Sequence, residues 1–176
     1  MEEDLIEKKI ASEKVYQGSF LQMFRDAVRL PNGREASREY VKHPGATAVV
    51  AITEDGRIAM VRQYRYPVGK VMLEIPAGKL DAGEDPLVCA KRELKEETGY
   101  VAQSWTKLTS LLTTPGFTDE VIHLYKAEQM RFDMACPDED EFIHVELYTP
   151  KELRAMIADG TIDDAKTIVA LLMAGI

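Results

Sequence analysis

The run 78–100 constrains the fold more than any other stretch, because it predicts a loop followed by a capped helix. Asp85 is a favourable N-cap, and Pro86 suits the first helical position, where a backbone N–H would have no partner inside the helix. Gly99 can adopt the left-handed conformation that closes a helix at its C-terminal end. The helix is therefore expected to span residues 86–98.

One face of this expected helix is acidic. At about 100° per residue, a single stripe carries the carboxylates of Glu93, Glu96 and Glu97. The stripe beside it is apolar and consists of Leu87, Ala90 and Leu94. Like charges four residues apart destabilise a helix by roughly 0.2–0.5 kcal/mol per pair, so a cation is expected on the acidic face. Clustered carboxylate oxygens suit Mg²⁺ or Mn²⁺, and a solvated acidic surface is the alternative interpretation.

The spacing of the polar residues in this run resembles the signature of the Nudix hydrolases. Five residues separate Gly78 from Glu84, and seven more lead to the block Arg92-Glu93-Leu94-Lys95-Glu96-Glu97-Thr98-Gly99-Tyr100. Seven specified residues match by chance in about one window per 10⁸. Tyr100 stands where the family more often has an aliphatic residue. The resemblance implies a loop–helix–loop that binds divalent cations and hydrolyses a nucleoside diphosphate linked to another moiety.

Length and charge limit the classes of protein to which the chain can belong. With 176 residues, of which 45% are hydrophobic, the chain is long enough for one core and too short for two comfortable domains. A single Nudix domain is expected over 1–176, with an N-terminal extension at 1–44 and a catalytic core at 45–176. The net charge of −8 disfavours nucleic acid or a membrane surface as a partner. Cys89 and Cys136 lack metal-ligand spacing, which favours reduced thiols in a cytoplasmic protein.

Hydrophobic patterns along the rest of the chain predict a mixture of strands and helices. Residues 1–12 read as a charged, weakly helical lead, and Pro31-Asn32-Gly33 reads as a turn between strands of a small sheet. Further strands are expected at 46–52, 58–61, 71–76, 105–112, 120–127 and 142–149, and further helices at 150–159 and 164–173. These patterns support only a mixed α/β class. The Nudix resemblance implies an α/β/α sandwich around a mixed sheet, preceded by a small antiparallel sheet.

Features outside the signature look like the ADP-ribose pyrophosphatase subfamily. Pro115, in Thr114-Pro115-Gly116-Phe117, lies 15 residues beyond Tyr100, where that subfamily is recognised by a proline. The N-terminal extension and the segments 38–46, 63–65 and 164–167 are also similar. The resemblance implies Mg²⁺-dependent hydrolysis of ADP-ribose to AMP and ribose 5-phosphate. The alternatives are a Nudix hydrolase of another sugar nucleotide, a dinucleoside polyphosphate or an oxidised nucleotide, and a non-catalytic ADP-ribose sensor.

The resemblance also assigns roles in the chemistry. The metal ligands would be the Ala77 carbonyl, Glu93, Glu97 and Glu141, with Glu96 as an additional ligand. Glu139 would be the general base for a water that the ions activate, although Glu139 and Glu141 could exchange these roles. Arg92 would hold a glutamate in its metal-binding rotamer. The alternative for the acidic loop 137–141 is an ordinary solvated turn.

Substrate contacts are expected from residues spread over the chain, namely Phe20, Arg38, Glu39, Arg65, Lys79, Thr114 and Glu120. Arginine can bond two phosphate oxygens at once, and an aromatic face can stack on adenine. As alternatives, Arg38 and Arg65 could be salt-bridge partners, and Phe20 could serve core or dimer packing. His43 could reach the substrate, whereas His123 and His144 are expected to be structural. The subfamily exchanges its N-terminal sheet between subunits, so the resemblance implies a homodimer.

Overall fold

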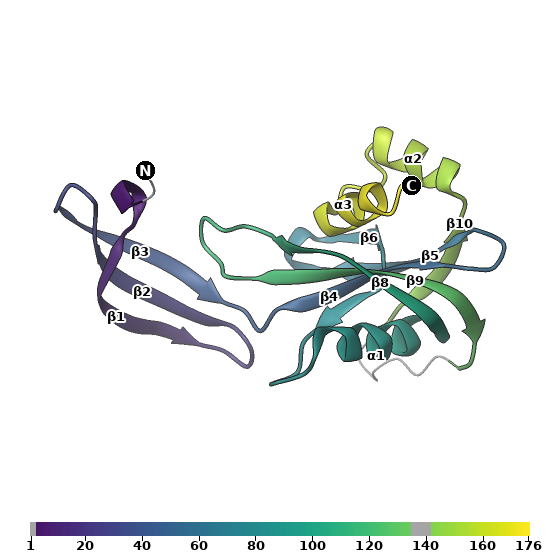
Figure 1. Cartoon of the computed structure of the whole chain (residues 1–176), viewed down its shortest axis with the longest axis horizontal. Coiled ribbons are helices and arrows are strands. Elements are labelled where there is room, and N and C mark those ends of the chain that lie inside the picture. The colour runs from purple at the N-terminus through teal and green to yellow at the C-terminus, as the bar shows by residue number, and fades with distance from the viewer. Residues whose placement is uncertain (1–2, 135–141) are drawn as a thin grey trace. The chain divides into compact units, whose positions relative to one another are not determined.

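The computed structural model describes residues 3–134 and 142–176. They form two compact units. The N-terminal unit comprises the chain up to Pro44 together with Leu112–Val121, and the core unit comprises Gly45–Leu111 and Ile122–Ile176. Figure 1 labels the helices and strands of both units.

The N-terminal unit is built on a three-stranded antiparallel sheet in the order β1-β2-β3, with strands Lys8–Gln17, Gln22–Arg29 and Glu35–Lys42. The turn expected at 31–33 joins β2 to β3, and Gly33 adopts a φ of 84°, which glycine tolerates without strain. The expectation of a helical lead over 1–12 is wrong beyond the short 3-10 turn Glu3–Leu5, because β1 begins at Lys8. Every residue of β1 is exposed, so no buried face distinguishes the strand. Its conformation is set by its pairing with β2.

The core unit contains a seven-stranded sheet whose central path runs β10-β5-β4-β9-β8. These strands are β4 Ala46–Ile52, β5 Ile58–Arg65, β8 Tyr100–Leu112, β9 Val121–Phe132 and β10 His144–Tyr148. Two shorter strands lie off this path, namely β6 Lys70–Glu74 beside β5 and β7 Ala77–Lys79 beside β4. β4 runs parallel to β9 and antiparallel to β5, so the sheet is mixed, and β4 is the buried central strand that its apolar run predicts.

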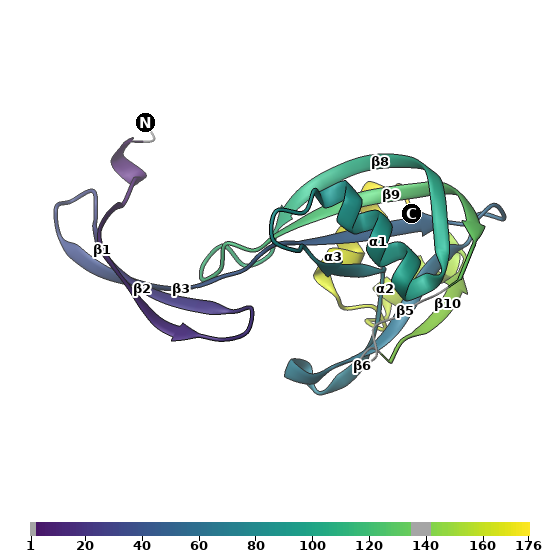
Figure 2. The same ribbon diagram turned by 90° about the horizontal axis from the view of Figure 1, so that it is seen from below.

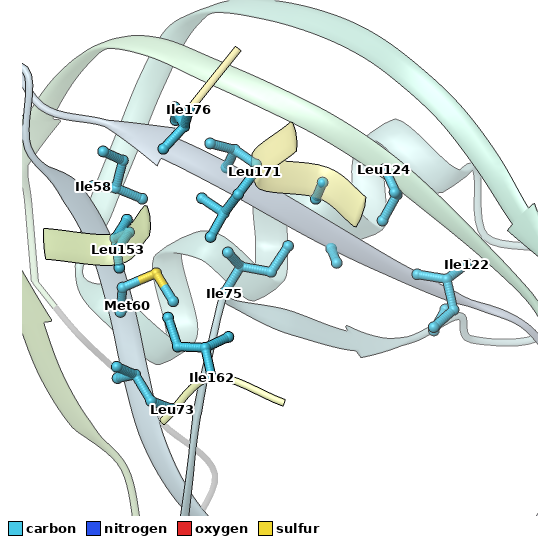
Figure 3. Close-up of a cluster of buried hydrophobic side chains, with 14 residues drawn as sticks. Ile58, Met60, Leu73, Ile75, Ile122, Leu124, Leu153, Ile162, Leu171 and Ile176 are labelled. Atoms are coloured by element: carbon cyan, nitrogen blue, oxygen red, sulfur yellow. The ribbon is translucent and has the colours of Figure 1, made fainter. Parts of the chain in front are cut away.

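Helices cover both faces of this sheet (Figures 1 and 2). Helix α1, Pro86–Thr98, packs on one face through Ala90 and Leu94, and these side chains join a buried cluster with β4 and β5 residues. Helices α2, Pro150–Ala158, and α3, Ala165–Met173, cover the other face over the larger cluster drawn in Figure 3. This arrangement confirms the α/β/α sandwich. No helix in the described ranges is both long and apolar enough to cross a membrane.

The boundaries of α1 confirm the expected helix 86–98. The Asp85 side chain accepts hydrogen bonds from the backbone N–H groups of Leu87 and Val88, and Gly99 closes the helix with a φ of 73°. The sequence did not predict β7, which occupies the start of the signature loop and pairs with β4. Three residues that include a glycine are too few to show an alternating pattern.

A cluster of four charges connects β5, β6 and α3. Nε and Nη2 of Arg65 each donate to one carboxylate oxygen of Glu74 at 2.8 Å. Lys166 also donates to Glu74, and it donates to Asp164, the N-cap of α3, at 3.0 Å. Burial acts to raise the pKa of Glu74, but the hydrogen bonds from Arg65 and the charge of Lys166 outweigh it and lower the pKa to about 2.

This depressed pKa predicts a loss of stability in acid. A carboxyl group whose pKa is lower in the folded state stabilises the fold fully above its unfolded-state pKa, here near 4.5, and loses that contribution as the pH falls towards 2. We expect wild type to exceed Glu74→Gln in unfolding free energy above pH 5, and the difference to shrink by about 2–3 kcal/mol by pH 2. Urea unfolding of both proteins across this range measures the difference. A difference in unfolding free energy that does not change with pH would contradict the ion pairing of Glu74 with Arg65 and Lys166.

Candidate active site

Helix α1 directs two glutamates of the signature against β7. Glu93 is 8% exposed and Glu97 is 4% exposed. One carboxylate oxygen of Glu97 accepts a hydrogen bond from the backbone N–H of Ala77 at 3.0 Å. A Cβ added at Gly78 would lie only 1.9–2.2 Å from the carboxylate atoms of Glu93. Glycine at position 78 therefore lets the Glu93 carboxylate approach the backbone of β7.

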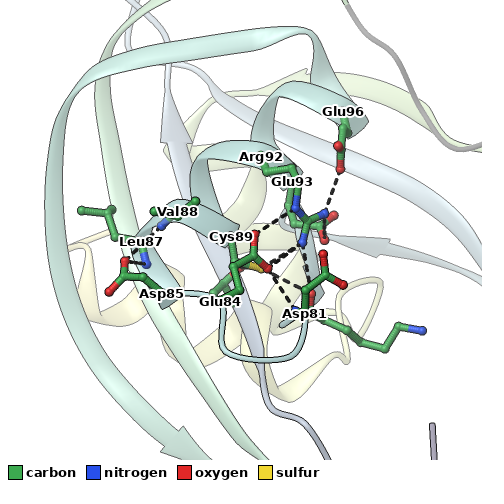
Figure 4. A network of polar contacts seen from close by, with 11 residues as sticks. Asp81, Glu84, Asp85, Leu87, Val88, Cys89, Arg92, Glu93 and Glu96 are labelled. Atoms are coloured by element: carbon green, nitrogen blue, oxygen red, sulfur yellow. Dashed lines mark hydrogen bonds and ion pairs between the residues drawn. The ribbon is translucent and has the colours of Figure 1, made fainter.

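Arg92 connects the acidic face of α1 to the loop that precedes it (Figure 4). Its Nη1 donates to Glu93 at 2.7 Å and to Glu96 at 3.0 Å. Its Nε and Nη2 donate to the two carboxylate oxygens of Glu84 at 3.1 and 3.0 Å. These hydrogen bonds lower the pKa of Glu84 to about 2, and the same carboxylates raise the pKa of Arg92. Arg92 thus compensates the charge repulsion that the sequence predicts on this face.

Cys89 belongs to the same helix and is buried. Its Sγ donates to the Lys79 carbonyl at 3.3 Å and accepts from the Thr47 hydroxyl at 3.5 Å. Burial raises the pKa of the thiol to about 11, so the side chain remains neutral at ordinary pH. These contacts agree with the structural role that the sequence favours for this thiol.

The donor atoms at this site suit a hard divalent cation. Glu93, Glu97 and the Ala77 carbonyl would supply only oxygen, as Mg²⁺ and Mn²⁺ prefer. Across the ranges 3–134 and 142–176, no three His, Cys, Asp or Glu side chains converge in an arrangement that would hold a metal. Two of the candidate ligands, Glu93 and Glu96, accept hydrogen bonds from Arg92. The expected ligand Glu141 and the expected base Glu139 lie outside the described residues.

Two further residues expected at the substrate lie in the core unit. Lys79 ends β7, directly after the backbone that contacts Glu93 and Glu97. Arg65 ends β5 in the bidentate pair with Glu74, so the salt-bridge alternative considered for it is present. Its side chain nevertheless keeps 37% exposure.

Arg38 and Glu39 lie on β3 of the N-terminal unit, and both form ion pairs there. Arg38 donates to Glu7 through Nε at 2.9 Å and also through Nη2. Glu39 accepts from Nε of Arg25 at 3.0 Å. The salt-bridge alternative for Arg38 is therefore also present.

The remaining predicted residues of the N-terminal unit gather around His43. The ring of Phe20, which is 45% exposed, meets the His43 ring edge-on with centroids 6.0 Å apart. Glu120 pairs with Nδ1 of His43 at 3.4 Å and accepts from the Thr113 hydroxyl at 2.8 Å. The Thr114 carbonyl accepts two backbone N–H groups in the turn that follows. Phe20, His43 and Glu120 are thus brought together from distant parts of the sequence.

The sequence did not predict that Glu74 and Lys166 form a charge cluster with Arg65. Glu74 and Lys166 lie 92 residues apart, and no local pattern indicates that they meet at Arg65.

His123 donates to or accepts from the Ser110 hydroxyl at 2.9 Å across neighbouring strands. This contact fits the structural role that the sequence favours for His123.

Comparison with known proteins identifies the family. Residues 42–171 match the NUDIX domain, and residues 7–41 match the nucleoside diphosphate sugar hydrolase N-terminal domain. The ADP-ribose pyrophosphatase of Bacillus subtilis (strain 168) is 44% identical over 95% of this chain and 91% of its own. The methanol dehydrogenase activator of Bacillus methanolicus is 47% identical over 94% of this chain and 90% of its own.

A solved structure supports the same fold. The crystal structure of an ADP compounds hydrolase superposes with a TM-score of 0.85, covering 96% of this chain and 92% of that one at 21% identity. Both domain matches, the extent of these likenesses and the carboxylate helix packed against Gly78 of β7 agree. The chain therefore belongs to the Nudix hydrolase family.

Proposed function

We propose that the protein is an ADP-ribose pyrophosphatase that cleaves its substrate to AMP and ribose 5-phosphate with the help of a divalent cation. The observation that carries this proposal is the complete set of signature carboxylates on α1, with Glu93 and Glu97 held against β7. The substrate follows from the 44% identity to an ADP-ribose pyrophosphatase over nearly the whole chain and from Pro115.

The proposed metal ligands are oxygen atoms that α1 and β7 bring close together. They are the Ala77 carbonyl and the carboxylates of Glu93 and Glu97, with Glu96 and Glu141 as additional ligands. A cation held by these groups, Mg²⁺ or Mn²⁺, would supply positive charge for the oxygens of the diphosphate. Arg92 steers the Glu93 and Glu96 side chains through Nη1, and the Ala77 N–H fixes one oxygen of Glu97.

Other residues of the chain would bind the substrate and move the proton. Glu139, or Glu141 in its place, is the proposed general base for the attacking water. In the N-terminal unit, Phe20 offers an exposed ring to a base, and Glu120 offers a carboxylate to hydroxyl groups. Arg38, Glu39 and Thr114 in that unit, and Lys79 and Arg65 in the core unit, complete the proposed contacts.

A second candidate function is activation of a dehydrogenase. The 47% identity to a methanol dehydrogenase activator favours it. That function and pyrophosphate hydrolysis can be separated, because only hydrolysis has to release AMP from a purified substrate. A non-catalytic role does not explain why α1 retains all the carboxylates of the signature.

The direct experiment measures release of the nucleoside monophosphate, which is AMP for ADP-ribose, from a panel of substrates in the presence of Mg²⁺. ADP-ribose should be cleaved with a kcat/KM at least about tenfold above those of other nucleoside diphosphate sugars and dinucleoside polyphosphates, a factor that corresponds to about 1.4 kcal/mol of discrimination. Release of a nucleoside monophosphate from none of these compounds would overturn the hydrolase proposal. A higher kcat/KM for another compound would reassign the substrate within the family.

A substitution on α1 tests the ligand role. Glu97→Gln keeps an oxygen that can accept from Ala77 but removes a charge from a repelling cluster, so the fold should survive. We expect kcat to fall by about 100-fold or more, because even groups that only orient a metal ligand are worth 10–100-fold. Glu54→Gln, in the exposed turn between β4 and β5, is the matched control and should keep wild-type kcat. A Glu97→Gln rate close to wild type at saturating Mg²⁺ would rule out the ligand role.

We further propose that the protein is a homodimer. Within the described part of the N-terminal unit, only Asp26 and Val28 are buried, so its sheet encloses almost no core. Large apolar side chains on that unit remain exposed, namely Ile10, Val15, Tyr16, Phe20 and Leu21. Covering them with a second copy would remove apolar area from water.

Light scattering on the purified protein tests the assembly. Two chains of 19.8 kDa should elute as one species of twice that mass. Replacing Tyr16, which is exposed on β1, with Glu should shift the population towards monomer, because burying an unpaired charge opposes association. A wild-type monomer with full activity would contradict the proposal.

A further inference from the structure

Glu74 holds Arg65 in one orientation. The carboxylate accepts from both Nε and Nη2 of Arg65 at 2.8 Å, a fork-to-fork contact that fixes the plane of the guanidinium. The Glu74 side chain is 1% exposed, whereas that of Arg65 is 37% exposed. One edge of the guanidinium is thus bound to a buried anion, while the Arg65 side chain as a whole remains partly exposed.

The opposite edge of the guanidinium retains a donor. Among residues 3–134 and 142–176, Nη1 of Arg65 has no hydrogen-bond partner. The second cation on Glu74, Lys166, is shared with Asp164, so the four side chains together carry no net charge. An anion that approached Nη1 would still find a donor pointing away from the buried carboxylate.

The pair lies on the same face of the sheet as α1. Val61 and Glu74 are directly opposite in the β5–β6 ladder, so their side chains share one face. Alternate residues of β5 also share that face, which places Arg65 with Val61 and with Ala59. Ala59 packs in the cluster formed with the α1 residues Ala90 and Leu94. Arg65 therefore lies on the side of the sheet that carries the signature carboxylates.

The chain also connects this pair directly to the carboxylate site. Only two residues, Ile75 and Pro76, separate Glu74 from Ala77, a path of at most about 11 Å, and the Ala77 N–H binds Glu97. The pKa of Arg65 is raised first by its hydrogen bonds to Glu74, and the charge of Glu97 contributes as well. A group bound to the carboxylate site would thus be close to the Arg65 guanidinium.

We propose that Glu74 is a positioning residue that presents Nη1 of Arg65 to a phosphate oxygen of the substrate. This inference rests on the proposed hydrolysis of a nucleoside diphosphate. Glu74 would not touch the substrate itself; it would keep the guanidinium from rotating towards solvent. Losing Glu74 should therefore weaken substrate binding through Arg65 and leave the chemical step largely intact.

A double-mutant cycle tests this dependence. The proteins are wild type, Arg65→Ala, Glu74→Gln and the double variant, each assayed for AMP release from ADP-ribose at saturating Mg²⁺. Each single change should raise KM by about tenfold or more, as expected for a lost charge-assisted hydrogen bond, and change kcat by less than about threefold. The double variant should raise KM no further than Arg65→Ala alone, because Glu74 acts only through Arg65.

Asp163→Asn is the matched control. Asp163 pairs with Lys70, which lies on β6 together with Glu74. The variant therefore removes a carboxylate from an exposed ion pair beside the same strand. It should keep the wild-type KM. If Glu74→Gln fails to fold, Glu74→Asp takes its place, because the shorter side chain keeps the charge but withdraws it from Arg65.

Several results would overturn the inference. An unchanged KM in the Glu74 variant, KM effects that multiply in the double variant, or a loss confined to kcat would each show that Glu74 does not act through Arg65. Failure of the proposed function gives a different result, because wild type would then release no AMP from ADP-ribose. In that event the same cycle is run on whichever diphosphate of the panel the wild type cleaves, and the KM criteria are unchanged.

Discussion

Repulsion among the carboxylates of α1 is the constraint on which the site depends. Glu93, Glu96 and Glu97 share one side of a thirteen-residue helix, and two of them are almost fully buried. A buried negative charge is costly unless cations or N–H donors compensate it. Arg92 and the backbone of β7 provide this compensation, so the short strand and the helix have to meet at a fixed distance. Gly78 makes that distance possible because it has no Cβ.

Local signals explain why this part of the fold could be predicted from the sequence. Asp85, Pro86 and Gly99 specify the ends of α1 through interactions within a few residues, and the structure follows them. The first part of β1, residues 8–12, could not be predicted in the same way, because its residues are exposed and its conformation is set by a partner strand. β7 is equally dependent on β4. Elements that owe their structure to distant pairing leave little trace in a sequence pattern.

The same distinction applies to the candidate site. Residues of the signature come from one helix and its preceding loop, so their spacing was sufficient to group Glu84, Arg92, Glu93 and Glu96, and the structure joins them. Arg65 could be named as a candidate, but its partners could not. Glu74 and Lys166 meet it only after β5, β6 and α3 have packed together. The charge cluster is a product of tertiary structure.

Comparing the two arginines shows how similar side chains can serve different purposes. Nε, Nη1 and Nη2 of Arg92 all donate to glutamates of the signature, so its charge is used within the acidic site. Arg65 binds a single carboxylate, whose charge is shared with Lys166. An incoming diphosphate would compete with glutamates for Arg92, whereas Nη1 of Arg65 has no partner among the residues that the structure describes. The fold therefore separates the arginine that stabilises the carboxylates from the one suited to receive an anion.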